Sequence, residues 1–192
     1  MAAAVHTTAG SSTSETSVSR PVKLIRVAVL MLAGFAIAFS APMHEQLGFD
    51  TAIAAIAIAA IGVAHLVEWF TLRATGGNPV PLLLGVVSIA AAIGIVFSGS
   101  VIAFAMLVAG WALVCALLEF VGSTVRPGSR QDAIFLGAIG MLLALLVVLV
   151  REDGVAVIGF LGAYAVLAGV FLGISAFDTR RPHAPRDAAA TR

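Results

Sequence analysis

Residues 101–121 read VIAFAMLVAGWALVCALLEFV, and Glu119 is the only charged side chain in this stretch. An α-helix rises about 1.5 Å per residue, so about 20 apolar residues cross a hydrocarbon core of roughly 30 Å. Comparable apolar stretches lie at about 22–41, 51–70, 80–97, 133–150 and 154–177. The sequence therefore predicts an all-α fold, an integral membrane bundle of six transmembrane helices.

The composition also indicates a membrane protein. Of the 192 residues, 60% are hydrophobic and 11% are charged, whereas soluble globular domains contain about 45–50% apolar and about 25% charged residues. The net charge is +1, and the basic residues form no stripe interleaved with aromatic side chains, so nucleic acid is not an expected partner. Cys115 is the single cysteine, which excludes a disulfide within the chain.

The basic residues alternate between the two sides of the predicted membrane. Of the eleven Lys and Arg residues, all but Arg151 lie around the start of the first stretch, after the last one, or in alternate connections. Because Lys and Arg in short connections favour the cytoplasmic side, both termini are predicted to be cytoplasmic. Arginine greatly outnumbers lysine, and Ala and Gly are abundant, which is typical of GC-rich bacterial genes. The predicted location is the bacterial plasma (inner) membrane.

We expect a membrane domain between two tails. Residues 1–19 are dominated by Ser, Thr and Ala and cannot bury enough apolar surface to offset chain entropy, so they are predicted to be a disordered cytoplasmic tail. Residues 20–178 are the predicted six-helix transmembrane domain, and residues 179–192 are a second cytoplasmic tail. The first stretch, with residues 36–38 reading AIA, also fits a cleaved secretory signal. A repeat that includes this helix disfavours that alternative.

The repeat is a unit of two helices used three times. A shift of 51 positions aligns residues 66–69, LVEW, with residues 117–120, LLEF. A shift of 53 positions aligns residues 109–112, AGWA, with residues 162–165, GAYA. The odd-numbered stretches each contain glycine in an aliphatic background. The sequence therefore predicts three helical hairpins of one kind.

On these residues the chain resembles the HdeD-like family of bacterial acid-resistance membrane proteins. Members of that family are short six-helix proteins built of repeated hairpins, with glycine near the middle of one helix. Their Gly-Trp element is similar to residues 109–114 here, AGWALV, and the resemblance covers about residues 22–177. It implies a role in acid or envelope stress tolerance, and the family provides no catalytic residue to carry over.

A candidate intramembrane polar cluster lies in the second and fourth stretches. His65, Glu68 and Glu119 are the titratable acids and bases well inside predicted helices, where ionisable groups are costly and are functional candidates. His65 lies three positions from Glu68, and Cys115 lies four positions from Glu119, so each pair shares a helix face. If the two helices pack together, these four side chains converge near the cytoplasmic ends of both.

Two interpretations of this cluster are open. In the first, it is a proton-linked or ion-binding site in which His65 is partly protonated near neutral pH. In the second, both glutamates reach the cytoplasmic interface and pair with Arg73 and Arg126, while His65 forms a hydrogen bond inside the bundle.

A second set of candidates lies in the connections predicted to face outward. Free carboxylates titrate near pH 4 and His near pH 6.5, so such groups would respond to external acid. Protonation would turn a mildly negative outer face positive, and the alternative is that these are ordinary solvated loop charges. The candidate outer-face titrating residues are His44, Glu45, Asp50, Glu152 and Asp153.

No enzymatic activity, cofactor or metal site is predicted. One His, one Cys and two Glu lack the spacing of a recognised metal-ligand set, and nothing in the sequence brings Cys115 within hydrogen-bond reach of His65. The chain also has no phosphate-binding glycine loop or nucleophile elbow. The predicted function is acid or envelope stress tolerance. The alternative is a small proton-linked transporter or channel subunit that uses the polar cluster.

Small residues indicate how the helices pack. Ala165, Gly169 and Gly173 recur at every fourth position, which lets a neighbouring helix approach closely. We expect packing within the bundle, and contact in an oligomer is the alternative. The predicted partners are the lipid bilayer and either a second copy or other membrane proteins.

Overall fold

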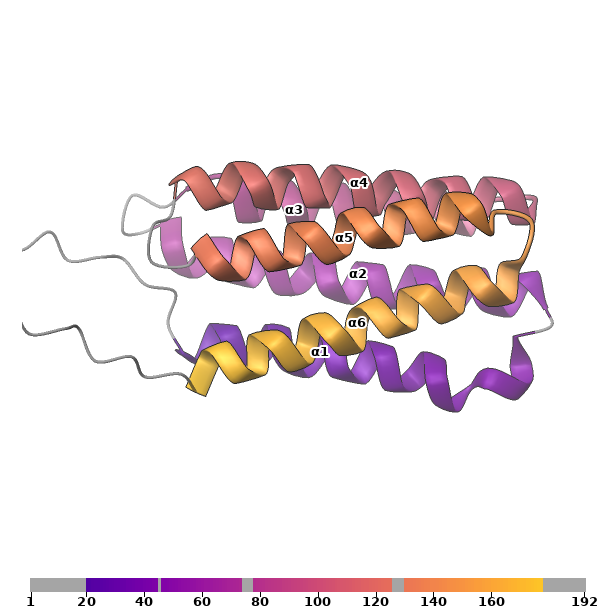
Figure 1. Cartoon of the computed structure of the whole chain (residues 1–192), viewed down its shortest axis with the longest axis horizontal. Coiled ribbons are helices and arrows are strands. Elements are labelled where there is room, and N and C mark those ends of the chain that lie inside the picture. The colour runs from indigo at the N-terminus through magenta and orange to yellow at the C-terminus, as the bar shows by residue number, and fades with distance from the viewer. Residues whose placement is uncertain (1–19, 45, 74–77, 126–129, 178–192) are drawn as a thin grey trace, which may run out of the picture.

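The computed structural model describes residues 20–44, 46–73, 78–125 and 130–177, and these residues are arranged as helices and short connections. The helices run side by side along the long axis of the molecule (Figure 1). Their bounds are α1 (Arg20–Phe39), the 3-10 helix η1 (Ala41–Met43), α2 (Leu47–Leu72), α3 (Val80–Val96), α4 (Val101–Val125), α5 (Arg130–Leu149) and α6 (Gly154–Phe177). The two predicted tails, 1–19 and 179–192, lie outside the described residues.

Five helices in the described ranges are long and apolar enough to cross a membrane, namely α1, α2, α4, α5 and α6. This supports the predicted all-helical, multi-pass architecture. The predicted third span, 80–97, corresponds to α3, an apolar helix of 17 residues. That length is at the lower limit of about 17–25 residues for a spanning helix, so this third span stays a prediction.

The helices alternate in direction, which gives the bundle two distinct ends. We call the end at which α1 begins and α6 ends the basic end; α3 and α5 also begin there (Figure 1). At the opposite end, short polar side chains begin two of the helices. Ser100 Oγ accepts a hydrogen bond from the Ala103 amide at 3.2 Å, and Asp153 Oδ1 accepts one from the Ala156 amide at 3.0 Å. These bonds satisfy amides that a helix start leaves without a helical partner.

The most extensive helix contacts do not follow three consecutive hairpins. They join α2 to α3, α4 to α5 and α1 to α6, whereas α1 with α2, α3 with α4 and α5 with α6 make fewer contacts. Two of the closest pairs are therefore connected at the basic end, and the third pair brings together the first and last helices. The predicted arrangement as three hairpins of one kind is not confirmed by this packing.

Glycine explains the closeness of α2 and α3. A Cβ atom placed on Gly62 would lie 2.9 Å from Cβ of Ser88, and one placed on Gly85 would lie 2.6 Å from Cδ2 of Leu66. Real Cβ atoms essentially never come this close to a neighbouring atom. The two glycines therefore set the distance between the backbones, as small residues do in membrane helix pairs.

Glycine residues also let α1 and α6 pack closely. A Cβ atom on Gly34 would lie 2.5 Å from Cγ2 of Val166, and one on Gly162 would lie 2.8 Å from Cγ2 of Ile37. Gly169, in the small-residue stripe of α6, faces Met31 of α1, whose Sδ would lie 2.9 Å from an added Cβ. At Gly169 the stripe is thus used for packing within the bundle, which is the expected role.

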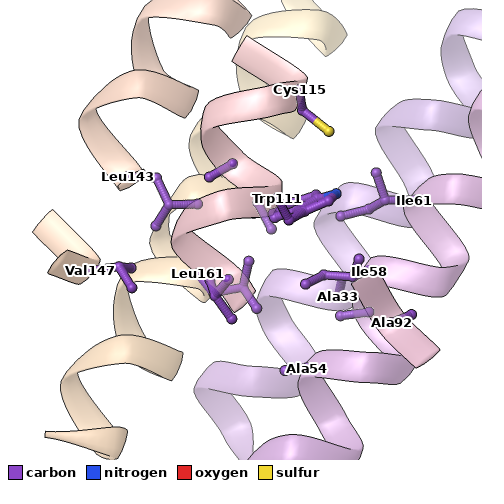
Figure 2. Packing of buried hydrophobic residues seen from close by; sticks show 14 of the residues in the cluster. Ala33, Ala54, Ile58, Ile61, Ala92, Trp111, Cys115, Leu143, Val147 and Leu161 are labelled. Carbon is purple, nitrogen blue, oxygen red and sulfur yellow. The ribbon is translucent and has the colours of Figure 1, made fainter. Parts of the chain in front are cut away.

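Trp111 occupies the middle of the buried core. Figure 2 shows its ring extending from α4 toward Ile58 and Ile61 of α2. Its Nε1–H donates a hydrogen bond to Ser88 Oγ at 3.0 Å, and Ser88 Oγ in turn donates to the Leu84 carbonyl at 2.8 Å. Tyr164 contacts the same ring edge-on, with the centroids 6.0 Å apart. Around Trp111, a hydrogen-bonded chain thus links α4 to α3 within apolar packing.

Candidate functional site

Arg26 of α1 joins the two carboxylates that the sequence places inside the bundle. Its Nη1 lies 3.0 Å from Glu68 Oε2 of α2, and its Nη2 lies 3.4 Å from Glu119 Oε1 of α4. The Glu68 side chain is 1% exposed and the Glu119 side chain is 14% exposed. We call these three residues the polar centre. The guanidinium suits this position because its fork of donors can serve two carboxylates at once.

A second ion pair lies beside the polar centre. Lys23 Nζ, one turn earlier on α1, lies 3.0 Å from Asp132 Oδ2 at the start of α5. Ser175 Oγ of α6 donates a hydrogen bond to the same carboxylate oxygen at 2.8 Å. The first helix therefore projects two cations into the bundle, one toward α2 and α4 and one toward α5 and α6.

A cavity of about 40 Å³ separates these two groups. Its charged lining consists of two basic and three acidic side chains, which are Lys23, Arg26, Glu68, Glu119 and Asp132. A volume of roughly 10–15 Å³ is sufficient for a water molecule where polar partners surround it. With all five groups ionised, the lining carries one excess negative charge. Such a lining favours the uptake of a proton or a small cation, because opposite charge stabilises buried carboxylates.

A smaller cavity of about 20 Å³ continues from the polar centre into the bundle. His65 and Cys115 line it together with Arg26 and Glu119, and the last two also line the larger cavity. His65 and Cys115 are both buried. The four residues of the predicted cluster, including Glu68, thus surround two adjoining cavities. The structure brings the second and fourth helices' polar residues together around one cation.

The alternative interpretation of the cluster is wrong for Glu68. That interpretation has the carboxylate reach the interface and pair with Arg73, but the Glu68 side chain is enclosed and bound to Arg26. Arg73 instead lies over two aromatic rings, 4.7 Å from the Phe70 centroid and 5.7 Å from the Trp69 centroid. Glu68 stays buried because Arg26 of α1 supplies a cation at the same depth. Arg126 lies outside the described residues.

The basic half of the site is not among the predicted residues. In the sequence, Lys23 and Arg26 indicate only the orientation of the first span, and Asp132 is not a candidate. A usable signal existed, because Lys23 and Arg26 lie three positions apart within 22–41 and so share a helix face. Two cations on one face of a spanning helix either extend to the interface or pair with acidic side chains inside the bundle.

The outer-face candidates separate into two kinds. His44 and Asp50 are buried, with His44 Nδ1 2.6 Å from Asp50 Oδ1 and His44 Nε2 2.9 Å from the Ile37 carbonyl oxygen. The alternative that they are ordinary solvated loop charges is therefore wrong for this pair, because tertiary packing encloses both. Glu152 and Asp153, in the connection between α5 and α6 at the same end of the bundle, are exposed. Glu45 lies outside the described residues.

Both ring nitrogens of His44 face oxygen atoms. Nδ1 faces the Asp50 carboxylate, and Nε2 faces the Ile37 carbonyl oxygen at 2.9 Å and Ser40 Oγ at 3.4 Å. A carbonyl oxygen only accepts hydrogen bonds. The ring is therefore held between the end of α1 and the start of α2 by polar contacts on both sides.

Comparison of the chain with protein-family models, with curated proteins and with solved structures found no match in any of the three. Among the described residues, no group of three or more His, Cys, Asp and Glu side chains is placed to hold a metal ion. The polar centre and the His44–Asp50 pair are therefore the two candidate sites of this chain.

Proposed function

We propose that this chain is a multi-pass membrane protein that binds and releases a proton or a small monovalent cation at the polar centre, as a small proton-linked transporter or channel subunit. The observation that supports this function is the convergence of Glu68 and Glu119 on Arg26, beside a cavity whose lining has three acidic and two basic side chains. Burying ionisable groups inside a membrane protein costs free energy, and such groups mark ion and proton pathways.

Glu119 is the group that exchanges the proton in this proposal. Its contact with Arg26 is longer than that of Glu68, its side chain is more exposed, and it lines both cavities. Protonated Glu119 would leave Arg26 paired with Glu68 alone, so every remaining buried charge in the polar centre keeps a partner. Glu68 is the fixed counter-ion that holds Arg26 in place.

His65 is the next group along the proposed pathway. It lies one turn from Glu68 toward the middle of α2, and it lines the smaller cavity with Glu119. Trp111, one turn beyond Cys115 on α4, also lines that cavity and packs against Tyr164. In this proposal a proton or cation that moves further into the bundle passes the Trp111 and Tyr164 rings, which both line that cavity.

Ion flux into proteoliposomes tests this function. Wild-type protein should acidify or load vesicles under an imposed proton or cation gradient, and Glu119→Gln should abolish that flux while the purified protein stays folded. Glu152→Gln, which neutralises an exposed carboxylate at the opposite end, is the matched control and should leave flux unchanged. Absence of flux for every cation in the wild type, or equal flux in Glu119→Gln, would contradict the proposal.

A role in acid or envelope stress tolerance is the second candidate, and it requires no catalytic activity. The resemblance to HdeD-like proteins motivates it, and the buried His44–Asp50 pair at the end predicted to be external favours it. This candidate places the protein in the bacterial inner membrane with both termini in the cytoplasm. Deletion should reduce survival at low external pH, and His44→Gln should reproduce the defect while Glu152→Gln does not. Equal survival of the deletion strain and its parent would refute this role.

A further inference from the structure

An apolar groove runs along the outside of the bundle between α1 and α6, at the basic end. Its volume is about 650 Å³, and its lining consists of Val27, Met31, Gly169, Val170, Gly173, Ile174 and Phe177. Ile174 and Phe177 are 66% and 63% exposed. In a membrane protein this surface faces lipid, because α1 and α6 are two of the helices that are long and apolar enough to span.

The groove fits within the depth of one lipid leaflet. Its lining on α6 runs from Gly169 to Phe177, eight positions that correspond to about 12 Å at 1.5 Å per residue. One leaflet of a bilayer contributes roughly half of the hydrocarbon core of about 30 Å. The groove is therefore long enough for most of one acyl chain in that leaflet.

A cation lies at the mouth of this groove. The Arg20 guanidinium carbon is 4.9 Å from the ring centroid of Phe177, which lines the groove. Lys23 and Arg26, the other cations on α1, are engaged with carboxylates inside the bundle. Arg20 thus presents positive charge where the headgroup of a lipid in the groove would lie. Arginine also matches phosphate with two parallel hydrogen bonds.

We propose that this groove binds one acyl chain of an anionic phospholipid, with the lipid phosphate at Arg20. A helix from a second copy is a poorer occupant, because Gly169, in the small-residue stripe, is already covered by Met31 of the same chain. Close helix approach between copies needs such small residues at the contact. The proposal needs a bilayer around the chain, but it uses no side chain of the polar centre.

Two variants and two matched controls test the site. Gly173→Leu fills the groove, and its Cβ would lie at an ordinary 3.6 Å from Cγ1 of Val27. Gly159→Leu adds the same bulk to α6 where an added Cβ meets nothing within 4 Å. Arg20→Gln removes the cation at the groove, and Arg151→Gln removes an exposed cation at the opposite end.

The measurement is native mass spectrometry of the full chain in detergent, titrated with phosphatidylglycerol or phosphatidylcholine of identical acyl chains. Wild type should bind phosphatidylglycerol about fivefold more tightly, the effect expected for one basic residue near an anionic headgroup. Arg20→Gln should remove this preference, Gly173→Leu should weaken binding of both lipids, and both controls should behave as wild type. Helical content and monodispersity verify folding, and Arg20→Gln tests the charge even if Gly173→Leu does not fold.

Three results would overturn the proposal. Equal binding of the two lipids by the wild type removes the role of Arg20. Unchanged lipid binding in a folded Gly173→Leu variant removes the groove. A dimeric wild type that Gly173→Leu converts to a monomer assigns the groove to a second copy.

Discussion

Nη1 of Arg26 lies 3.0 Å from Oε2 of Glu68, and this ion pair fixes the first helix of the bundle against the second at a depth where the glutamate is closed off from solvent. Removing one partner of a buried pair leaves a charge that neither water nor protein compensates. The contact therefore links the stability of the fold to the site at which ion exchange is proposed.

Arg26→Gln should destabilise the protein by about 3 kcal/mol, because it leaves Glu68 and Glu119 without their common cation. The free energy of unfolding in mixed detergent and SDS micelles measures the effect. Arg73→Gln, at an exposed residue stacked on Phe70, is the control. The double variant Arg26→Gln with Glu68→Gln should recover part of the loss, and a double variant as unstable as the sum of the two would contradict the pairing.

Gly85→Leu should destabilise the bundle by about 1–3 kcal/mol, since the added side chain overpacks the contact with α2. An added Cβ at Gly85 meets Leu66 Cδ2 at 2.6 Å, whereas one at Gly110 meets nothing within 4 Å. Gly110→Leu is therefore the matched control and should cost little. Thermal unfolding followed by circular dichroism distinguishes the two, and equal melting temperatures would show that α2 and α3 do not approach as described.

His44 and Asp50 should be energetically coupled. A double-mutant cycle of His44→Gln and Asp50→Asn should give an interaction energy of about 1 kcal/mol or more, because His44 Nδ1 and Asp50 Oδ1 lie 2.6 Å apart in a buried contact. The unfolding free energies of the wild type, the two single variants and the double variant provide the cycle. The corresponding cycle of His44→Gln with Glu152→Gln should give an interaction near zero, since Glu152 is exposed. Strictly additive effects for His44 and Asp50 would rule out the pair.

Ser88→Ala should cost about 1–2 kcal/mol, because it leaves the indole N–H of Trp111 buried without its acceptor. In a Trp111→Phe background the same substitution should cost much less, since the donor is already gone. Unfolding free energies of the four proteins measure this difference. The prediction fails if Ser88→Ala costs the same in both backgrounds.

The approximate positions of the helices could be predicted from the sequence, because they depend on the local run of apolar residues. The stretch 101–121 contains one charged residue and lies within α4, and the connections at Ser100 and Asp153 begin helices with side-chain caps. The spacing of His65 and Glu68, and of Cys115 and Glu119, also predicted which side chains share a face. These features depend on residues a few positions apart.

Helix pairing was not readable, because small residues occur in every apolar stretch and do not specify a partner. Gly34 contacts α6 and Gly85 contacts α2, although both lie in similar aliphatic surroundings. Arg26 was missed for a related reason. Its position at the start of a span has a sufficient explanation in topology, and only the tertiary packing shows that it bridges Glu68 and Glu119.

The close packing of α1 against α6 has a consequence for biogenesis. If the chain is threaded into a membrane from its N-terminus, α1 is released before α6, so the bundle cannot close until α6 has emerged. Until then α1 lacks the surface that receives Gly34, and Ser175 is missing beside Lys23 and Asp132. The contact between α1 and α6 would thus form last in assembly. A chain truncated before α6 would leave the α6-facing side of α1 uncovered, a feature that protein quality control can recognise.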